Sequence, residues 1–133
     1  MAVFYSHSDK ETIEWAKGYG RTLQEGDVVL LEGAMGAGKT MLAKGIIAGM
    51  GISDEVTSPT YAYVNEYDGR VFHFDCYRVA SEAQAYGLGL ADYFERGGVC
   101  LVEWSDNIRS LLPETCKTVV ISGEGNGIRE IRF

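Results

Sequence analysis

The stretch Gly33-Ala34-Met35-Gly36-Ala37-Gly38-Lys39-Thr40 decides how this chain is interpreted. It fits the pattern G-x-x-x-x-G-K-[ST] of a phosphate-binding loop, or P-loop. The glycines let the backbone turn tightly with its N–H groups pointing inward, which gives a nest of donors for phosphate oxygens. Lys39 would bring a positive charge to the β- and γ-phosphates, and the Thr40 hydroxyl would take one coordination position on Mg²⁺.

The sequence on both sides of this loop supports the match. Residues 27–32 form a short apolar run, which is typical of a buried parallel strand. After the loop, Leu42, Ile46 and Met50 recur at every fourth position and predict a helix that ends at Gly51. The positive end of this helix would face the anion. The order of strand, glycine loop and helix therefore predicts a site for a nucleoside triphosphate.

Length and composition predict a single domain that spans residues 1–133. The chain is 46% hydrophobic, which suits one compact core. No apolar run approaches the roughly 18 residues of a membrane span, and residues 6–9 lack the layout of a signal peptide. Cys76, Cys100 and Cys116 form no C-x-x-C pair and are expected to be small buried hydrophobes. Together these features predict a cytoplasmic protein with no membrane partner.

The net charge of −7 argues against tight, independent binding to nucleic acid. Such binding draws most of its sequence-independent affinity from Lys and Arg side chains that contact phosphates. The chain contains no run of these residues. If the protein serves a nucleic-acid reaction, we expect it to do so through other proteins.

Patterns along the rest of the chain predict a mixed sheet with helices packed on it. Ser8 and Glu11 form a capping-box pattern that opens a helix reaching about residue 24, and Asp68-Gly69 suits a type I′ turn in a β-hairpin. Other strands are expected at residues 2–6, 61–67, 70–75, 99–103, 118–122 and 128–133, and short helices at 81–86, 89–94 and 107–112. The predicted fold is a small α/β P-loop NTPase domain with an inserted β-hairpin and flanking helices. No segment is long enough to be the arginine-bearing lid of a kinase.

Two acids at strand ends are the candidates for Mg²⁺–nucleotide chemistry. Glu103 ends an apolar strand and Asp75 ends the alternating strand 71–75, so each carboxylate can face the P-loop. Spacing leaves open which of the two orders the water ligands of the metal and which orients an attacking water. The alternative for each is a solvated acid at the end of a strand.

Other positions are open to two interpretations. Residues 57–61 are either a nucleotide-sensing switch segment or an ordinary loop with a proline. His73 alternates with aromatic residues, which favours a packed or hydrogen-bonded histidine over a catalytic one. Arg78 would reach phosphate or pair with a nearby acid, and Trp104 is most simply a core or pocket wall.

Five short motifs occur along the chain: Gly33-x-x-Gly36-Ala37-Gly38-Lys39-Thr40, Ser58-Pro59-Thr60-Tyr61, His73-Phe74-Asp75-Cys76-Tyr77-Arg78, Asp92-Tyr93-Phe94 and Leu101-Val102-Glu103-Trp104. Taken together, they resemble the bacterial TsaE family, formerly called YjeE. They follow the family's order and approximate spacing and cover most of the chain. Each motif is weak alone, whereas the combination is highly specific.

This resemblance implies an ATPase required for N6-threonylcarbamoyladenosine (t6A) at position 37 of tRNAs that read ANN codons. Members of the family act with TsaD, which transfers the threonylcarbamoyl group, and with its paralogue TsaB, and they meet tRNA through these partners. ATP hydrolysis would drive or reset the TsaD–TsaB complex. No arginine finger is evident in the sequence, so low intrinsic turnover is expected. The alternatives are a small-molecule kinase and an interaction module that binds ATP without useful hydrolysis.

The resemblance also assigns roles to residues by position. Thr40 and Glu103 resemble the Mg²⁺ ligands of the family, and Asp75 its essential aspartate. The catalytic residues are then expected to be Asp75, Glu103 and Lys39. Contacts to ATP are expected from Thr12 near the nucleoside end, Met35, Gly36, Ala37, Gly38, Lys39, Thr40, Met41 and Trp104.

The loop departs from the family's usual pattern at two places. Gly33-Ala34-Met35-Gly36 stands where the family commonly has Gly-Asp-Leu-Gly, and Met41 stands where it often has a second threonine. Neither change removes a group that the phosphate cradle needs, so nucleotide binding is expected to persist. The lost acid bears instead on partner contact and on the rate of hydrolysis.

Overall fold

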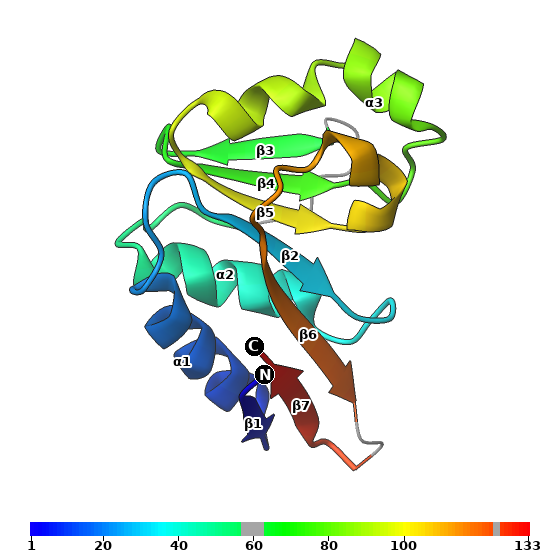
Figure 1. Ribbon diagram of the computed structural model, residues 1–133. Helices are drawn as coiled ribbons and strands as arrows, with labels where there is room; N and C mark the ends of the chain where they lie inside the picture. Colours follow the sequence, from blue (N-terminus) through cyan, green and yellow to red (C-terminus); the bar gives the residue numbers. More distant parts are fainter. Residues whose placement is uncertain (57–62, 124–125) are drawn as a thin grey trace.

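The chain folds around one seven-stranded mixed sheet (Figure 1). The structure is a computed structural model that describes residues 1–56, 63–123 and 126–133. Its strands are β1 (Val3–Ser6), β2 (Val28–Glu32), β3 (Val64–Tyr67), β4 (Val71–Asp75), β5 (Val99–Glu103), β6 (Lys117–Gly123) and β7 (Arg129–Arg132). They lie in the order β1-β7-β6-β2-β5-β4-β3, in which β6, β2, β5 and β4 are parallel and the remaining pairs are antiparallel. The mixed α/β fold predicted from the sequence is confirmed.

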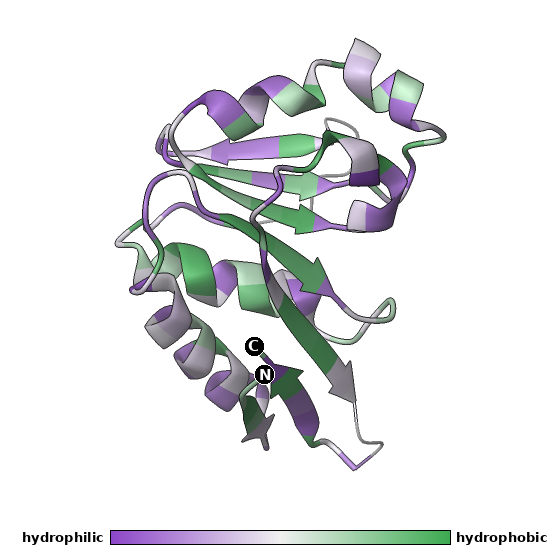
Figure 2. Cartoon of the chain, viewed as in Figure 1, coloured by the Kyte–Doolittle hydropathy of each residue, from purple (hydrophilic) through white to green (hydrophobic). Residues whose placement is uncertain are grey.

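Helices cover both faces of this sheet, which explains the continuous apolar runs of the central strands. The helices α1 (Asp9–Gly20) and α2 (Lys39–Gly49) pack on one face. The other face carries α3 (Glu82–Gly87) and the 3₁₀ helices η1 (Leu90–Glu95) and η2 (Ser105–Leu111). Along β2, Val29 and Leu31 face α2 while Val28 faces the opposite cluster. Apolar residues accordingly dominate both sides of β2 and β5 and most of α2 (Figure 2).

Helix α1 begins as predicted but ends earlier. The Ser8 side chain accepts a hydrogen bond from the Glu11 N–H, as the capping-box pattern predicts. The predicted end near residue 24 is wrong, because α1 stops at Gly20. The next residues turn away from the helix, and the N–H of Gln24 donates to Asp27 Oδ2 at 2.8 Å, which directs the chain into β2.

The later elements match their predictions with small differences. The hairpin β3–β4 turns through Asp68 (φ 54°) and Gly69 (φ 63°), the two left-handed residues of the predicted turn. The segments predicted at 89–94 and 107–112 form the 3₁₀ helices η1 and η2, as is common for short connectors. The expected switch segment, residues 57–61, lies outside the described residues. The two edge strands of the sheet, β1 and β3, lie within segments that were predicted as strands.

The three cysteines pack as the sequence predicts. Cys76 and Cys100 are buried in the second core cluster and Cys116 is half-buried, and all three are free thiols. Burial raises the pKa of the Cys100 thiol to about 12, as expected for a residue that packs as a small hydrophobe. Within the described ranges, every helix is too short or too polar to cross a bilayer.

Helices α1 and α2 approach each other closely through glycines. A Cβ atom at Gly45 would lie 2.4 Å from the Ala16 Cβ and 2.7 Å from the Ile13 carbonyl oxygen. A Cβ atom at Gly49 would lie 2.1 Å from the Lys17 carbonyl oxygen. This contact presses α2 against α1 and thereby fixes the helix whose N-terminus follows the glycine loop.

We expect Gly45→Ala to lower the free energy of unfolding by about 1–3 kcal/mol, because the added methyl group overpacks the helix contact. Gly18→Ala on α1 is the matched control, since nothing lies within 4 Å of its added Cβ atom. Helix propensity predicts that this control raises stability by up to about 1 kcal/mol. Urea unfolding of both variants measures the difference. Equal stability of the two would contradict a tight helix contact.

Candidate functional site

The glycine loop leaves the carboxyl end of β2 and leads into the N-terminus of α2, the order predicted from the sequence. Gly33 has φ 157°, and a Cβ atom there would lie 2.5 Å from the Ile121 carbonyl oxygen. Gly38 caps α2 with φ 117°, a value that side chains rarely tolerate. The loop therefore needs glycine at these positions to pass close to β6. The loop thus ends at the N-terminus of α2, and helix N-termini commonly bind anions.

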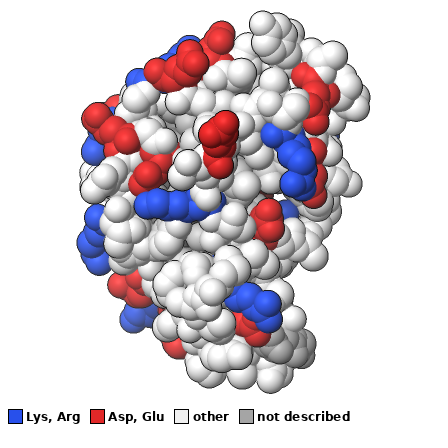
Figure 3. Space-filling model, viewed as in Figure 1, with Lys and Arg blue, Asp and Glu red and all other residues white. Residues whose placement is uncertain are grey.

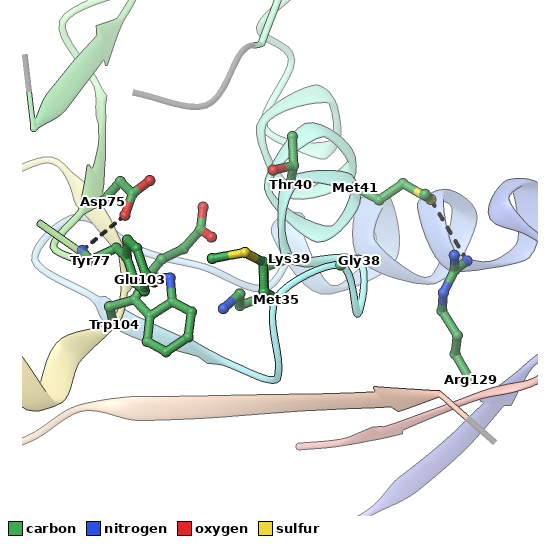
Figure 4. Close-up of a pocket in the computed structure, with 11 residues that line it drawn as sticks. Met35, Gly38, Lys39, Thr40, Met41, Asp75, Tyr77, Glu103, Trp104 and Arg129 are labelled. Atoms are coloured by element: carbon green, nitrogen blue, oxygen red, sulfur yellow. Dashed lines mark hydrogen bonds between the residues drawn. The ribbon is translucent and has the colours of Figure 1, made fainter. Parts of the chain in front are cut away.

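Two carboxylates come together beside this loop because their strands are neighbours in the sheet. Strands β4 and β5 are parallel, and Asp75 is paired with Glu103 at their carboxyl ends. Residues paired in this way direct their side chains to the same face. In Figure 4, both carboxylates point toward the start of α2, where Lys39 and Thr40 lie.

Each of the two carboxylates has one oxygen held by the protein. Asp75 Oδ1 accepts a hydrogen bond from the Tyr77 N–H at 3.0 Å, and Asp75 itself is half-buried. Glu103 is only 5% exposed, and its Oε2 lies 2.6 Å from Nε2 of the fully buried His73. The alternative of a solvated acid at a strand end therefore does not describe Glu103. The expectation of a hydrogen-bonded strand histidine at position 73 is confirmed.

Lys39 is nearly buried and lies between the loop and the carboxylates. Its Nζ donates to the Gly33 carbonyl oxygen at 2.7 Å and lies 3.8 Å from the centroid of the Trp104 ring. Burial lowers the pKa of the Lys39 ammonium, although the charges of Glu103 and Asp75 oppose this change. An anion in the cavity would compensate the charge that burial disfavours.

Trp104 forms one wall of the site by an unusual turn of the chain. Directly after Glu103 it adopts a left-handed conformation (φ 58°, ψ 46°), which is rare for a large side chain. Its ring contacts Lys39, and the Tyr77 ring packs on it with a centroid distance of 4.9 Å. Such strain is typical of positions where the surrounding structure directs a side chain into a functional site.

A cavity of about 310 Å³ joins these groups. It is lined by Met35, Gly36, Gly38, Lys39, Thr40, Met41, Asp75, Tyr77, Glu103, Trp104 and Arg129. The structure thus brings together all the predicted site residues except Thr12 and Ala37. The latter is half-buried and packs toward the first core cluster.

Two other sequence candidates lie elsewhere. Thr12 is fully buried, with its Oγ1 2.6 Å from the Ser6 Oγ, and it ties β1 to α1 rather than lining the cavity. Arg78 is exposed and does not line the cavity either.

Sequence reasoning missed two residues of the cavity, Tyr77 and Arg129. Tyr77 lies within the H-x-D-x-Y-R pattern, two residues after Asp75, so the sequence alone could have placed it in the site. Arg129 comes from β7, far along the chain, and no sequence pattern links it to the loop. Its guanidinium contacts Asp9 Oδ1 at 2.6 Å and lies 4.0 Å from Met41 Sδ, at the side of the cavity next to α1 (Figure 4).

The chain is similar to known proteins both in sequence and in overall structure. A family model described as "Threonylcarbamoyl adenosine biosynthesis protein TsaE" matches residues 6–131. The tRNA threonylcarbamoyladenosine biosynthesis protein TsaE of Treponema pallidum (strain Nichols) is 41% identical over 128 residues, which cover 95% of each chain. The protein of the same name from Bacillus subtilis (strain 168) is 42% identical over 127 residues, or 93% of this chain and 79% of that one. The crystal structure of Bacillus subtilis YdiB superposes with a TM-score of 0.82 at 35% identity, covering 98% of this chain and 82% of that one.

Proposed function

The chain belongs to the TsaE family of threonylcarbamoyl adenosine biosynthesis proteins, and on this premise we propose that it is a Mg²⁺-dependent ATPase of tRNA t6A biosynthesis. It binds ATP in the cavity beside the glycine loop and hydrolyses it to ADP and phosphate. Hydrolysis drives or resets a threonylcarbamoyl-transfer complex of TsaD and TsaB, which binds the tRNA.

The observation that carries this proposal is the meeting of three groups in one cavity. A glycine loop at a helix N-terminus offers N–H donors to phosphates, Lys39 adds a cation, and Asp75 and Glu103 add two carboxylates. These are the components that positioning and electrostatic stabilisation require in phosphoryl transfer. The cavity is also large enough for the phosphates and part of a nucleoside.

Each side chain has a role that follows from its position. Lys39 exchanges its hydrogen bond to the Gly33 carbonyl for a phosphate oxygen. The Thr40 hydroxyl and the Glu103 carboxylate would hold Mg²⁺, which neutralises charge on the phosphates.

Asp75, held at Oδ1 by the Tyr77 N–H, orients the attacking water with its other oxygen. The Trp104 and Tyr77 rings pack on each other and form a wall of the cavity.

The arginines of the chain support a low intrinsic rate. Arg129 is the arginine among the described lining residues, and it lies on the α1 side, away from the two carboxylates (Figure 4). Arg78, the candidate named from the sequence, is exposed outside the cavity lining. An arginine finger is worth about 10³–10⁵ in rate, so its supply by a partner would stimulate hydrolysis strongly.

The surface charge supports an indirect role toward tRNA. The net charge is −7, and on the face seen in Figure 3 basic and acidic side chains are interspersed. Contacts to tRNA phosphates would then come from TsaD and TsaB rather than from this chain.

Arg129→Ala is expected to weaken ATP binding about tenfold, because it removes a cation beside Met41 and Gly38 at the edge of the cavity. Arg132→Ala is the matched control, since Arg132 lies on the same strand and is paired with Glu130 instead. Isothermal titration calorimetry with ATP and Mg²⁺ measures both. Equal affinities for the two variants would show that Arg129 does not contribute to ATP binding.

The proposed function is tested by reconstituting tRNA modification with TsaD, TsaB and the separate threonylcarbamoyl-AMP synthase under multiple-turnover conditions. Mass spectrometry of the tRNA nucleosides should show t6A accumulating only when this protein and hydrolysable ATP are present. A parallel ATPase assay should show a rate that rises as the TsaD–TsaB complex is added. If t6A accumulates equally without the protein, the proposal fails, and transfer of phosphate to a small acceptor becomes the reaction to seek.

A further inference from the structure

The imidazole of His73 lies directly behind the carboxylate of Glu103. It lies two residues before Asp75 on β4 and shares the α2 face of the sheet with Val71 and Asp75. The side chain is fully buried, and Nε2 lies 2.6 Å from Glu103 Oε2. The imidazole does not line the cavity.

The direction of this hydrogen bond follows from its partner. An ionised carboxylate only accepts, so Nε2–H of His73 donates to Glu103 Oε2. Glu103 Oε1 is then the oxygen without a hydrogen bond to the described residues. The imidazole therefore fixes which oxygen of Glu103 remains for a ligand, and with it the rotation of the carboxylate.

The other ring nitrogen indicates that the imidazole is not kept for packing. His73 Nδ1 is buried and has no hydrogen-bonding partner in the part of the chain that the structure describes. An unpartnered buried polar atom costs free energy that an apolar side chain at the same place would avoid. The neighbouring position on this face, Val71, is apolar and fully buried. The benefit of histidine at position 73 must therefore lie at Nε2, where it meets Glu103.

We propose that His73 is a positioning residue, which holds the Glu103 carboxylate in the orientation that binds the Mg²⁺ of the nucleotide complex. This inference rests on the proposed function and deepens it. His73 touches neither nucleotide nor metal and acts only through Glu103. Groups that orient a metal ligand in this way commonly change metal affinity by about 10–100-fold when they are removed.

The test compares two variants of His73 that differ in reach and polarity. His73→Gln keeps an N–H donor near the position of Nε2, whereas His73→Leu removes it. Calorimetry gives the affinity for ATP with excess Mg²⁺ and with EDTA, and the ratio of the two is the Mg²⁺-dependent gain. We expect His73→Leu to reduce this gain about tenfold with little change in EDTA, and His73→Gln to retain most of it.

Controls separate positioning from a general loss of structure. His7→Leu is the matched control, because His7 is exposed on the surface, pairs with Glu11 and does not line the cavity. In a Glu103→Gln background, His73→Leu should produce no further change in the gain, since its effect passes through Glu103. Thermal unfolding establishes that each variant is folded. If His73→Leu does not fold, His73→Asn replaces it, because its shorter amide does not reach the position of Nε2.

Two kinds of failure are distinguishable in the same experiment. An unchanged gain in His73→Leu overturns the positioning role, as does an equal loss in His73→Gln and His73→Leu. A loss of ATP affinity that is the same with Mg²⁺ and with EDTA also overturns it, because it indicates a structural role. If the unaltered protein binds no ATP under either condition, the proposed function itself fails, and the role of His73 fails with it.

Discussion

Lys39→Ala is expected to abolish measurable ATP hydrolysis, with a loss of at least about 100-fold, and to weaken ATP binding by about 10–100-fold. Lys39 belongs to the glycine loop and is only 6% exposed, with its Nζ 2.7 Å from the Gly33 carbonyl oxygen. Without it, the phosphates would lose a charge-assisted hydrogen bond in a site that already contains two carboxylates. Calorimetry and a phosphate-release assay with the TsaD–TsaB complex measure the two effects.

Lys44→Ala provides the matched control for this variant. Lys44 lies on the same helix, α2, but its side chain is exposed and does not line the cavity. It should therefore leave binding and hydrolysis within about twofold of the unaltered protein, as is usual for a surface substitution. A Lys39→Ala protein that still binds and hydrolyses ATP normally would show that the cavity is not the nucleotide site.

Asp75→Asn and Glu103→Gln are expected to lower hydrolysis by about 10²–10⁴-fold while the protein still binds ATP. The two variants should differ in their response to Mg²⁺. Glu103→Gln removes a proposed metal ligand and should lose most of the Mg²⁺-dependent gain in affinity. Asp75→Asn should keep this gain, because Asp75 is assigned to the attacking water. Single-turnover hydrolysis and binding with and without Mg²⁺ separate these outcomes.

Asp68→Asn is the control for both carboxylate variants. Asp68 is exposed at the hairpin turn, pairs with Arg70, and has a left-handed conformation that asparagine accepts well. The decisive measurement is t6A formation in the reconstituted system. If Asp75→Asn and Glu103→Gln both bind ATP and fully support modification, hydrolysis is not the function, and the chain is a nucleotide-dependent interaction module.

The glycine loop and the strand ends could be predicted because their signals are local. The loop pattern lies within residues 33–40, and the apolar runs before Glu32 and Glu103 mark buried strands. These signals placed Asp75, Glu103 and Lys39 among the candidates. The extent of each element was less certain, as α1 shows, because turn hydrogen bonds near Gln24 override a helical pattern.

Neither the order of the strands in the sheet nor the finer geometry of the site could be predicted from the sequence. The pairing of β4 with β5 brings His73 to Glu103, and the position of β7 brings Arg129 to the cavity. Both depend on contacts between segments that are distant in sequence. The left-handed conformation of Trp104 is a third example, since nothing in its local sequence indicates a turn that glycine normally occupies.

The central place of β2 has a consequence for the order in which the chain folds. β2 pairs with β5 at Val28 and Cys100 and with β6 at Val29 and Lys117, so both of its neighbours come from far along the chain. Contacts of such high sequence separation form slowly, because long loops must close first. We therefore expect pulse-labelled hydrogen exchange during refolding to show β2 gaining protection as late as β6, and early protection of β2 alone would contradict this. The glycine loop leaves the ribosome before β5 and β6, so its final geometry has to wait until both of these strands have been synthesised.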